Sequence, residues 1–308
     1  MKETCWVLAG PTASGKTALS LRLAQEHNCE IICMDSMQIY RGMDIGTAKP
    51  TAEERALVPH HMADVADPME GYSVARYQEE AEACVRDIHR RGRRALFVGG
   101  TGLYLRALRH PMAMGGTTGD PAFRLAMETL AETDGGRERL YAMLQETDPE
   151  SANAIHMNNV RRVIRALEVQ HLTGLPFSKQ PQVEAEPPFR YRVASLTMER
   201  ETLYQRIEHR VDMMLRDGLI EEVRGLLKRG VPADAQAMMG LGYKELIPYI
   251  RGECSLEDAV YALKLGTRHY AKRQLTWMRR EEDVQWVNSL AQDAYEQLER
   301  WFTEGEEA

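Results

Sequence analysis

One segment, residues 10–17 (GPTASGKT), limits what this chain can fold into more than any other. It matches the pattern G-x-x-x-x-G-K-[ST] in full, after an apolar run at residues 6–9 and before an amphipathic stretch at residues 17–27. In this setting the glycines let backbone N–H groups surround an oxyanion, the helix N-terminus adds positive potential, and the lysine places a charge on the terminal phosphate. The segment therefore predicts a diphosphate-binding loop, whose residues are Gly10, Pro11, Thr12, Ala13, Ser14, Gly15, Lys16 and Thr17.

The same loop predicts a metal, because the hydroxyl of Thr17 stands where loops of this kind ligate Mg²⁺. We expect Mg²⁺ as the cofactor and Thr17 as its ligand from the protein. The loop alone leaves open whether the diphosphate belongs to a nucleotide or to another molecule.

Around this loop, the first part of the chain alternates short apolar runs with amphipathic stretches, which is typical of βαβ units. Further strands are predicted at residues 30–34, 95–98 and 191–196, and helices at residues 72–91 and from residue 103. We predict an α/β fold with a P-loop NTPase-like parallel sheet as its core. Ligands lie outside the carboxyl ends of such strands, so the segments after residues 9, 34 and 98 should converge on one crevice.

Two connectors divide the chain. Residues 115–119 (GGTTG) lie in a stretch with little apolar periodicity, and residues 176–188 contain four prolines. Only helical patterns lie between these connectors, and helices are predicted again at residues 200–217, 220–229, 256–279 and 291–302. We therefore predict a first part of the core at residues 1–115, an all-α insertion domain at residues 116–184, and completion of the core with basic C-terminal helices at residues 185–308.

The charge balance restricts the partners. The formal net charge is −7, which argues against indiscriminate attraction to nucleic acid, so that any RNA site must be local. No run of about 18 apolar residues appears, and the N-terminus lacks the pattern of a signal peptide. We expect a cytoplasmic protein that does not associate with membranes.

Neither the histidines nor the cysteines predict a metal centre. His60 and His61 are adjacent, so they point in different directions, and no third nitrogen or sulfur ligand is evident. The five cysteines form no C-x-x-C pair, and their spacing is irregular. We predict a structural role for both sets, with the cysteines reduced.

One polar segment follows the predicted strand at residues 30–34, and another follows the predicted strand at residues 95–98. Asp35 ends the strand at residues 30–34, where its carboxylate would point into the same crevice as Lys16. It is a candidate general base, although an aspartate at this point is equally typical of a capped turn. Residues 99–102 (GGTG) bring the hydroxyl of Thr101 to the same crevice, and alone they are no more than a glycine-rich turn.

Two basic stretches contain no acidic residue. Residues 156–165 hold Arg161, Arg162 and Arg165. Charge runs are most often solvated faces of helices. Two such stretches in an acidic protein, one of them with three aromatic residues, favour contact with a phosphate backbone and exposed bases. The second stretch, residues 261–280, holds Lys264, Arg268, Lys272, Arg273, Arg279 and Arg280.

Taken together, these motifs resemble the bacterial tRNA dimethylallyltransferases. The longest and most specific of them is residues 35–50 (DSMQIYRGMDIGTAKP). The resemblance runs in order along nearly the whole chain, and no Cys/His zinc module follows it, as in the bacterial form. The glycine-rich residues 115–119 depart from the pattern. The other matching segments are residues 10–17, 59–61, 98–104, 120–124, 162–168, 242–243 and 267–277.

The resemblance implies transfer of a dimethylallyl group from dimethylallyl diphosphate to the exocyclic amine of the adenosine 3′ of a tRNA anticodon, with release of diphosphate. Ser14, Lys16 and Thr17 would stabilise the leaving group together with Mg²⁺. Asp35 would accept a proton from the amine, and Thr101 would fix this base in line with the allylic carbon. The implied catalytic residues are Asp35, Thr101 and Lys16, in a monomer.

The tRNA base must leave its stack to reach such a crevice, which requires residues that hold its displaced neighbours. Arg124 would reach this crevice from the start of the helical insertion. Three other readings remain: a small-molecule P-loop kinase, an adenylate isopentenyltransferase that uses free nucleotide, and a non-catalytic RNA-binding protein. The implied tRNA contacts are Asp35, Ser36, Met37, Gln38, Thr101, Phe123, Arg124, Asn159, Val160, Arg161, Arg162, Val163, Arg165, Lys264, Arg268, Lys272 and Arg273.

Overall fold

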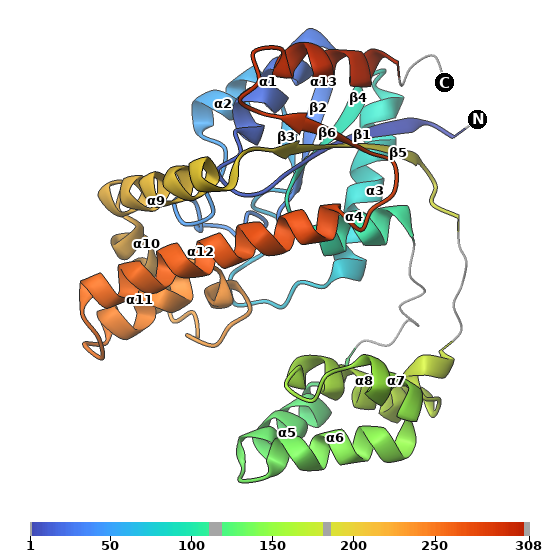
Figure 1. The fold of residues 1–308 in the computed structure, drawn as a ribbon, viewed down its shortest axis with the longest axis vertical. Helices are drawn as coiled ribbons and strands as arrows, with labels where there is room; N and C mark the ends of the chain where they lie inside the picture. Colours follow the sequence, from blue (N-terminus) through green and yellow to red (C-terminus); the bar gives the residue numbers. More distant parts are fainter. Residues whose placement is uncertain (1, 111–118, 181–185, 305–308) are drawn as a thin grey trace. The chain divides into compact units, whose positions relative to one another are not determined.

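A computed structural model of the chain describes residues 2–110, 119–180 and 186–304, and within them one sheet of six strands forms the core (Figure 1). The strand order is β3-β2-β4-β1-β5-β6, and every pair of neighbours is parallel. The predicted α/β fold is confirmed. The strands are β1 (Thr4–Ala9), β2 (Cys29–Met34), β3 (His60–His61), β4 (Arg94–Gly99), β5 (Arg190–Thr197) and β6 (Val284–Asn288).

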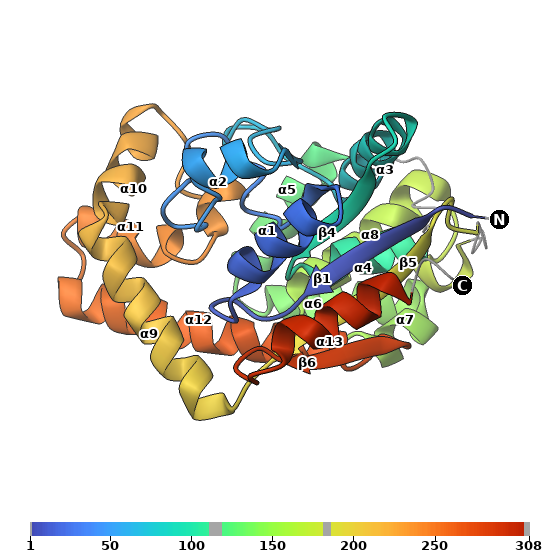
Figure 2. The ribbon, with the colours of Figure 1, turned by 90° about the horizontal axis from the view of Figure 1, so that it is seen from above.

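Helices cover both faces of the sheet, as a parallel sheet requires. On one face α1 and α13 pack, and Trp6 of β1 stacks on Phe302 with ring centroids 4.3 Å apart. On the other face α3 and α4 pack (Figure 2). Tyr77 of α3 stacks on Tyr104 of α4. The helices of this unit are α1 (Lys16–Glu26), α2 (Ala52–Leu57), α3 (Val74–Arg90), α4 (Gly102–Arg109), α9 (Arg200–Arg216), α10 (Leu219–Lys228), α11 (Tyr243–Ile250), α12 (Leu256–Met278) and α13 (Ala294–Thr303).

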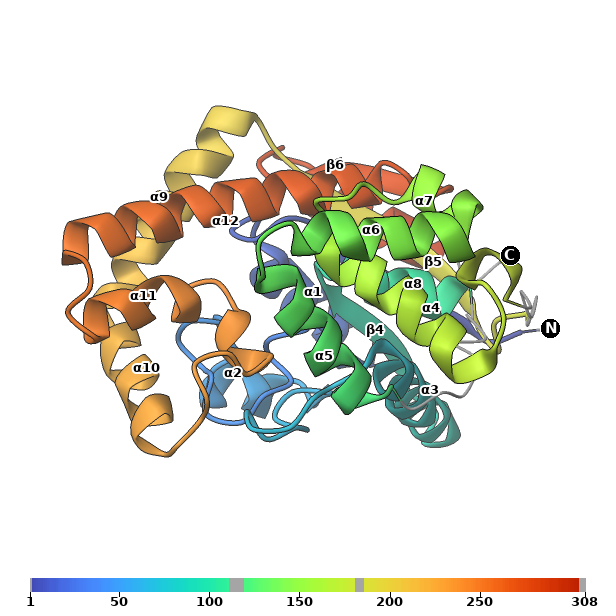
Figure 3. The same cartoon turned by 90° about the horizontal axis from the view of Figure 1, so that it is seen from below.

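Four of these helices, α9 to α12, lie between β5 and β6 in the sequence and enlarge the core. Helix α11 lies between α10 and α12, and α12 also packs on α9 (Figure 3). Their buried side chains, such as Val223, Tyr243 and Leu263, belong to the same hydrophobic cluster as the α3 face of the sheet. The arrangement brings residues from far along the sequence to the edge of the sheet where β1, β2 and β4 end.

Residues 110–186 form a second compact unit made of helices. Its own core contains Leu140, Leu144, Val163 and Ile164. The predicted bounds of the insertion, residues 116 and 184, lie outside the described residues, as do residues 115–118 of the glycine-rich connector. The described helices are α5 (Pro121–Glu132), α6 (Gly136–Thr147), α7 (Pro149–Ala154), α8 (Val160–Thr173) and the short 3₁₀ helix η1 (Phe177–Lys179).

The sequence pattern did not predict two of the strands and two of the α-helices. Strand β6 lies at the edge of the sheet, and Val287 is its one fully buried residue, so it shows no clear apolar alternation. Helix α11 contains Pro248, which usually ends a helix. Helix α2 and strand β3 are too short to show a period.

Candidate functional site

The diphosphate-binding loop forms between β1 and α1 as predicted for its position. Gly10 has a φ of +149°, and a Cβ at this position would lie 3.0 Å from Cβ of Leu196, so the loop requires glycine there. Gly15, with a φ of +90°, precedes α1 without a side-chain cap. The N–H groups of the first turn of α1 are therefore available to an anion.

Two side chains of the loop are arranged for an anion. Ser14 Oγ is buried and has no hydrogen-bond partner among the described residues. Lys16 Nζ donates to the carbonyl oxygens of Gly10 at 2.9 Å and Pro11 at 2.8 Å. Burial, and to a smaller extent the charge of Arg210, lower the pKa of Lys16 to about 8, although the charge of Asp35 opposes both effects. A bound anion would pair with this half-buried ammonium group and stabilise its charged form.

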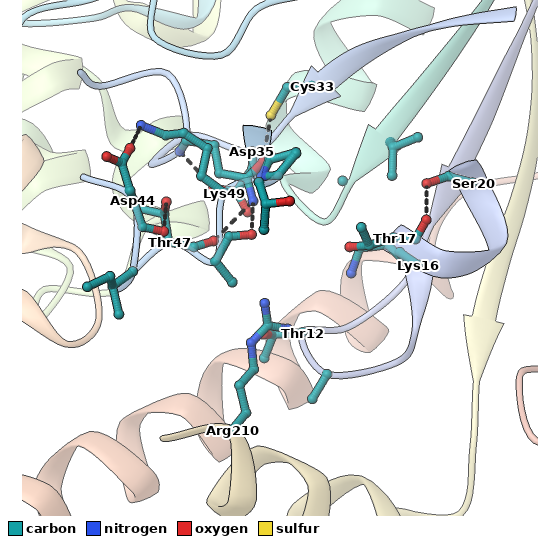
Figure 4. Close-up of a pocket in the computed structure, with 18 of the residues that line it drawn as sticks. Thr12, Lys16, Thr17, Ser20, Cys33, Asp35, Asp44, Thr47, Lys49 and Arg210 are labelled. Atoms are coloured by element: carbon teal, nitrogen blue, oxygen red, sulfur yellow. Dashed lines mark hydrogen bonds and ion pairs between the residues drawn. The ribbon is translucent and has the colours of Figure 1, made fainter. Parts of the chain in front are cut away.

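A cavity of about 1210 Å³ opens beside the loop. Its walls are the loop, the end of β2, the segment at residues 44–52 and one face of α9 (Figure 4). A second cavity of about 250 Å³ lies between residues 35–47 and helices α9 and α12. Both cavities are lined by Thr12, Asp35, Thr47 and Arg210. Two molecules, one in each cavity, would therefore come close to one another beside these residues.

Asp35 follows β2 and forms the capped turn, which is one of the two roles that its sequence position left open. Its Oδ1 accepts hydrogen bonds from the backbone N–H groups of Met37 at 2.9 Å and Gln38 at 3.4 Å, as in a capped turn. Its Oδ2 makes no hydrogen bond within the described residues and is available to accept a proton. The turn therefore fixes the carboxylate without using up both of its oxygens.

Thr101 lies beside this segment. Its Oγ1 accepts a hydrogen bond from the N–H of Ser36 at 3.1 Å, and its own N–H donates to the carbonyl of Met34 at 3.2 Å. Burial raises the pKa of Tyr270, whose hydroxyl also interacts with the side chain of Thr101. The loop after β4 thus supports the residue next to Asp35.

Gln274 of α12 joins two of the three loops, and sequence reasoning missed it as a site residue. Its Oε1 accepts from the N–H of Thr12 at 2.9 Å, and its Nε2 donates to the carbonyl of Gly100 at 3.1 Å. A Cβ on Gly100 would collide with this amide, so the close approach needs glycine. Gln274 is 5% exposed and shares the buried face of α12 with Ala271 and Met278. A polar residue on an otherwise apolar helical face was the signal.

Two arginines of α9, also missed, face the loop. Arg206 Nε donates to the carbonyl of Ala13 at 2.9 Å. Arg210 reaches from α9 into the space between the loop and Asp35 (Figure 4). It makes no ion pair or hydrogen bond within the described residues, and burial lowers its pKa. Each precedes a buried residue of α9, Ile207 or Val211, and no motif distinguishes them.

In the helical unit, the predicted RNA contacts on α8 differ in accessibility. Arg161 and Arg162 are exposed and pair with no acid in the described part of the chain. Arg165 pairs with Glu168 at 2.7 Å, and this fully buried carboxylate also binds Arg124 at 2.6 Å.

Val163 requires a correction, because it is 1% exposed in the core of the helical unit and its side chain is unavailable to RNA. The other predicted contacts of the unit have ordinary surroundings. Asn159 precedes α8 without capping it, Val160 packs at the edge of the core, and Phe123 stacks on His171 with centroids 4.5 Å apart.

On α12 the predicted basic face is partly neutralised. Lys264 Nζ lies 2.6 Å from Asp212 Oδ1, and Arg268 Nη1 lies 3.1 Å from Glu208 Oε1, both on α9. Lys272 and Arg273 are exposed, and Arg273 lines the second cavity. Residues 261–280 therefore contain no acidic residue, but two of their cations pair with acidic residues of α9 in the fold.

The histidines and cysteines have structural surroundings. His61 Nε2 lies 2.6 Å from the buried carboxylate of Glu30, and His60 Nδ1 lies 2.7 Å from the carbonyl of Val58. All five cysteines are free. Within the described residues, no helix is both long and apolar enough to cross a membrane.

Comparison with known families agrees with this geometry. A family model described as IPP transferase matches residues 38–281, and one described as isopentenyl transferase matches residues 3–58. The tRNA dimethylallyltransferase of Shouchella clausii (strain KSM-K16) is 49% identical over 287 residues, which are 93% of this chain and 92% of that protein. The tRNA dimethylallyltransferase of Carboxydothermus hydrogenoformans is 44% identical and covers 99% of this chain and 98% of its own length.

Solved structures are similar along the whole chain. The tRNA isopentenylpyrophosphate transferase of Bacillus halodurans superposes with a TM-score of 0.72 at 44% identity, over 99% of this chain and 96% of that one. A eukaryotic dimethylallyltransferase acting on tRNA superposes with a TM-score of 0.79 at 31% identity, over 99% of this chain and 77% of that one. Both likenesses span the sheet, the helical unit and the C-terminal helices.

Proposed function

The chain belongs to the IPP transferase family and is an enzyme that prenylates tRNA, and we propose that its donor is dimethylallyl diphosphate. The observation that carries this assignment is the pair of cavities that share Asp35, Thr12 and Arg210. The larger cavity, lined by the diphosphate-binding loop, takes the donor. The smaller one takes the adenine, so that its exocyclic amine faces the allylic carbon beside Asp35.

In the transfer, the bond between the allylic carbon and the diphosphate oxygen breaks, and a bond from that carbon to the adenine nitrogen forms. The diphosphate leaves with the electron pair. The N–H groups of the loop, Lys16 and Arg210 surround the position of this leaving group, and they stabilise the charge that develops on it. Ser14 Oγ, which is buried and has no hydrogen-bond partner in the described part of the chain, supplies one further donor.

The amine loses a proton as the new bond forms, because the product nitrogen would otherwise stay positively charged. Asp35 Oδ2 accepts that proton, while Oδ1 remains bound in its turn. Thr101 supports the base through its hydrogen bond with the N–H of Ser36. Lys16 therefore acts on the leaving group, and Asp35 acts on the attacking amine.

Mg²⁺ fits the oxygen donors at the start of α1. The hydroxyl of Thr17 is exposed on the cavity wall and offers one hard ligand, and the diphosphate would supply others. When bound, the ion would add positive charge at the leaving group. We also propose that the enzyme acts as a monomer in the cytoplasm, where its tRNA substrate is available.

The alternatives are weaker. The curated relatives are named for activity on tRNA, which disfavours a free nucleotide as acceptor. A small-molecule kinase would not need the helical unit that the family shares, and a non-catalytic protein would not need Asp35 beside Lys16.

The test is incubation of the protein with Mg²⁺, labelled dimethylallyl diphosphate and either unmodified tRNA or AMP. Label should enter tRNA and not AMP, and chelation of the metal should stop the transfer. Label in AMP alone would overturn the assignment. In the same assay Asp35→Ala should retain diphosphate binding and lose most turnover, and unchanged turnover would remove Asp35 from the role of base.

A further inference from the structure

Each of the two carboxylate oxygens of Glu222 on α10 accepts two hydrogen bonds. Its Oε2 accepts hydrogen bonds from the backbone N–H groups of Asp44 and Ile45, both at 2.8 Å. Its Oε1 accepts from the N–H of Gly46 at 3.0 Å and from the hydroxyl of Tyr243 at 2.6 Å. Three successive N–H groups form an anion-binding concavity, and here a side chain of the protein fills it. We call these four hydrogen bonds the Glu222 clamp.

The residues around the clamp are shaped for it. A Cβ on Gly46 would lie 2.7 Å from the ring of Tyr243, so only glycine lets the phenol reach Glu222. Tyr243 is fully buried, and burial together with the charge of Glu222 raises its pKa, which keeps its hydroxyl a donor. On the other side of the segment, Lys49 Nζ binds the side chain of Asp44 at 2.6 Å.

The clamped segment, residues 44–47, lies in the wall of both cavities. Thr47 lines each of them, and Gly46 lines the smaller one opposite α9 and α12. Gln38 Nε2 donates to the carbonyls of Thr47 at 3.0 Å and Ala48 at 3.1 Å. The N–H of Gln38 in turn approaches Asp35 Oδ1 at 3.4 Å. Hydrogen bonds, joined by the covalent backbone of residues 46–47 and by Gln38 itself, thus link Glu222 with the carboxylate of Asp35.

We propose that Glu222 is a positioning residue for the transfer, which holds residues 44–47 against α10 and α11 and thereby fixes Asp35 and the wall of the smaller cavity. Glu222 touches neither substrate. Its effect rests on the proposed function, because one of the two cavities beside the clamped segment is assigned to the adenine. Within the described residues, no hydrogen bond of the clamp involves the diphosphate-binding loop.

The sharpest variant is Glu222→Gln, which keeps the shape of the side chain. Its amide offers one oxygen, so in either orientation the NH₂ group faces two of the four donors. Glu221→Gln is the matched control, because Glu221 is the neighbouring residue on the same helix and, within the described residues, its ion pair is with Arg224 at the surface. Tyr243→Phe removes one hydrogen bond and leaves the ring against Gly46.

We expect Glu222→Gln to lower the single-turnover rate on saturating tRNA by about ten- to a hundredfold, the scale of a small misplacement of reacting groups. The affinity for inorganic diphosphate should match that of the parent protein. Amide hydrogen exchange at residues 44–46 should become faster. Tyr243→Phe should show the same pattern with a smaller loss, and Glu221→Gln should show none of it.

Three outcomes of the kinetic and binding assays would overturn the proposal: a single-turnover rate like that of the control, a rise in KM for tRNA with an unchanged rate, or a loss of rate matched by an equal loss of diphosphate-binding capacity. The last would mark a purely structural role. Transfer by the parent protein tests the proposed function separately. Exchange at residues 44–46 reports the clamp even without activity, and unchanged exchange in Glu222→Gln would refute it.

Discussion

The cations beside the cavity and the cations on the surface of this protein differ in how they can act. Lys16 and Arg210 are already removed from much of the solvent, and burial lowers the pKa of both. Their attraction to a small anion is therefore strong and little screened by salt. Arg161 and Arg162 are exposed and hydrated, so they act on a polyanion mainly by releasing its counterions. With the proposed substrates, one protein would thus hold two anionic molecules by different physical means.

A second difference separates the surface cations from each other. The stretches at residues 156–165 and 261–280 look alike in the sequence, since both lack acids. In the fold, Lys264 and Arg268 of the second stretch pair with acids of α9. Arg161 and Arg162 of the first stretch have no such partners within the described residues. The absence of acids along a sequence is therefore a poor measure of free positive charge.

The largest effect should come from Arg210→Met, which keeps an unbranched apolar side chain and removes the charged guanidinium group. Loss of a charged hydrogen-bonding group at the diphosphate should weaken inorganic diphosphate binding by about 1.5–3 kcal/mol, or roughly ten- to a hundredfold. The loss should persist at high salt, because the group is half-buried. Calorimetric titration measures it. Arg216→Met, an exposed arginine at the end of the same helix, is the control, and equal effects of the two would contradict the comparison.

A pH effect should follow from Lys16. The free protein holds its pKa at about 8, below the usual value, and a bound anion favours the charged form. Above pH 8 binding must therefore take up a proton, and the affinity should fall by up to about tenfold per pH unit. The uptake can be measured by calorimetry at pH 9 in buffers of different ionisation enthalpy.

Lys16→Arg separates this effect from the ionisation of diphosphate itself. The arginine stays charged throughout, so the extra pH dependence and the proton uptake should disappear in this variant. If the variant and the parent protein lose affinity in parallel as the pH rises, Lys16 is not the titrating group.

The residues of the site differ in whether the sequence alone could predict their roles. Lys16 and Asp35 were predicted because each lies in a contiguous motif whose local geometry decides its role. Arg210, Gln274 and Glu222 were missed, because their roles depend on contacts with segments far along the chain. Gln274, for example, binds the N–H of Thr12, 262 positions away. No local pattern sets the register of α12 against that loop, and only the packed fold brings the two together.

An intermediate effect should come from Arg161→Ala combined with Arg162→Ala. If both contact tRNA phosphates, the variant should bind tRNA more weakly, and the slope of log K against log salt should become less steep by about one unit per arginine. Filter binding over a series of salt concentrations measures this slope. The structure favours this pair over Arg161 with Arg165, because Arg165 is held by Glu168. A slope equal to that of the parent protein would make these arginines a solvated face.

The smallest effect should come from Lys264→Ala combined with Arg268→Ala, although this removes the same formal charge. The two cations already face Asp212 and Glu208, so few counterions are displaced when tRNA binds. The salt slope should stay within about half a unit of the parent value, and the free energy of unfolding should change by about 1 kcal/mol or less per exposed pair.

Lys272→Ala with Arg273→Ala provides the matched comparison on the same helix. These two side chains are exposed, and Arg273 lines the smaller cavity, so their removal should flatten the salt slope more than removal of the paired cations does. If the paired and the exposed cations of α12 change the slope equally, then tRNA must displace Asp212 and Glu208 from their partners on binding. In that case the acids of α9 would be part of the RNA-binding surface rather than a reason to exclude Lys264 and Arg268 from it.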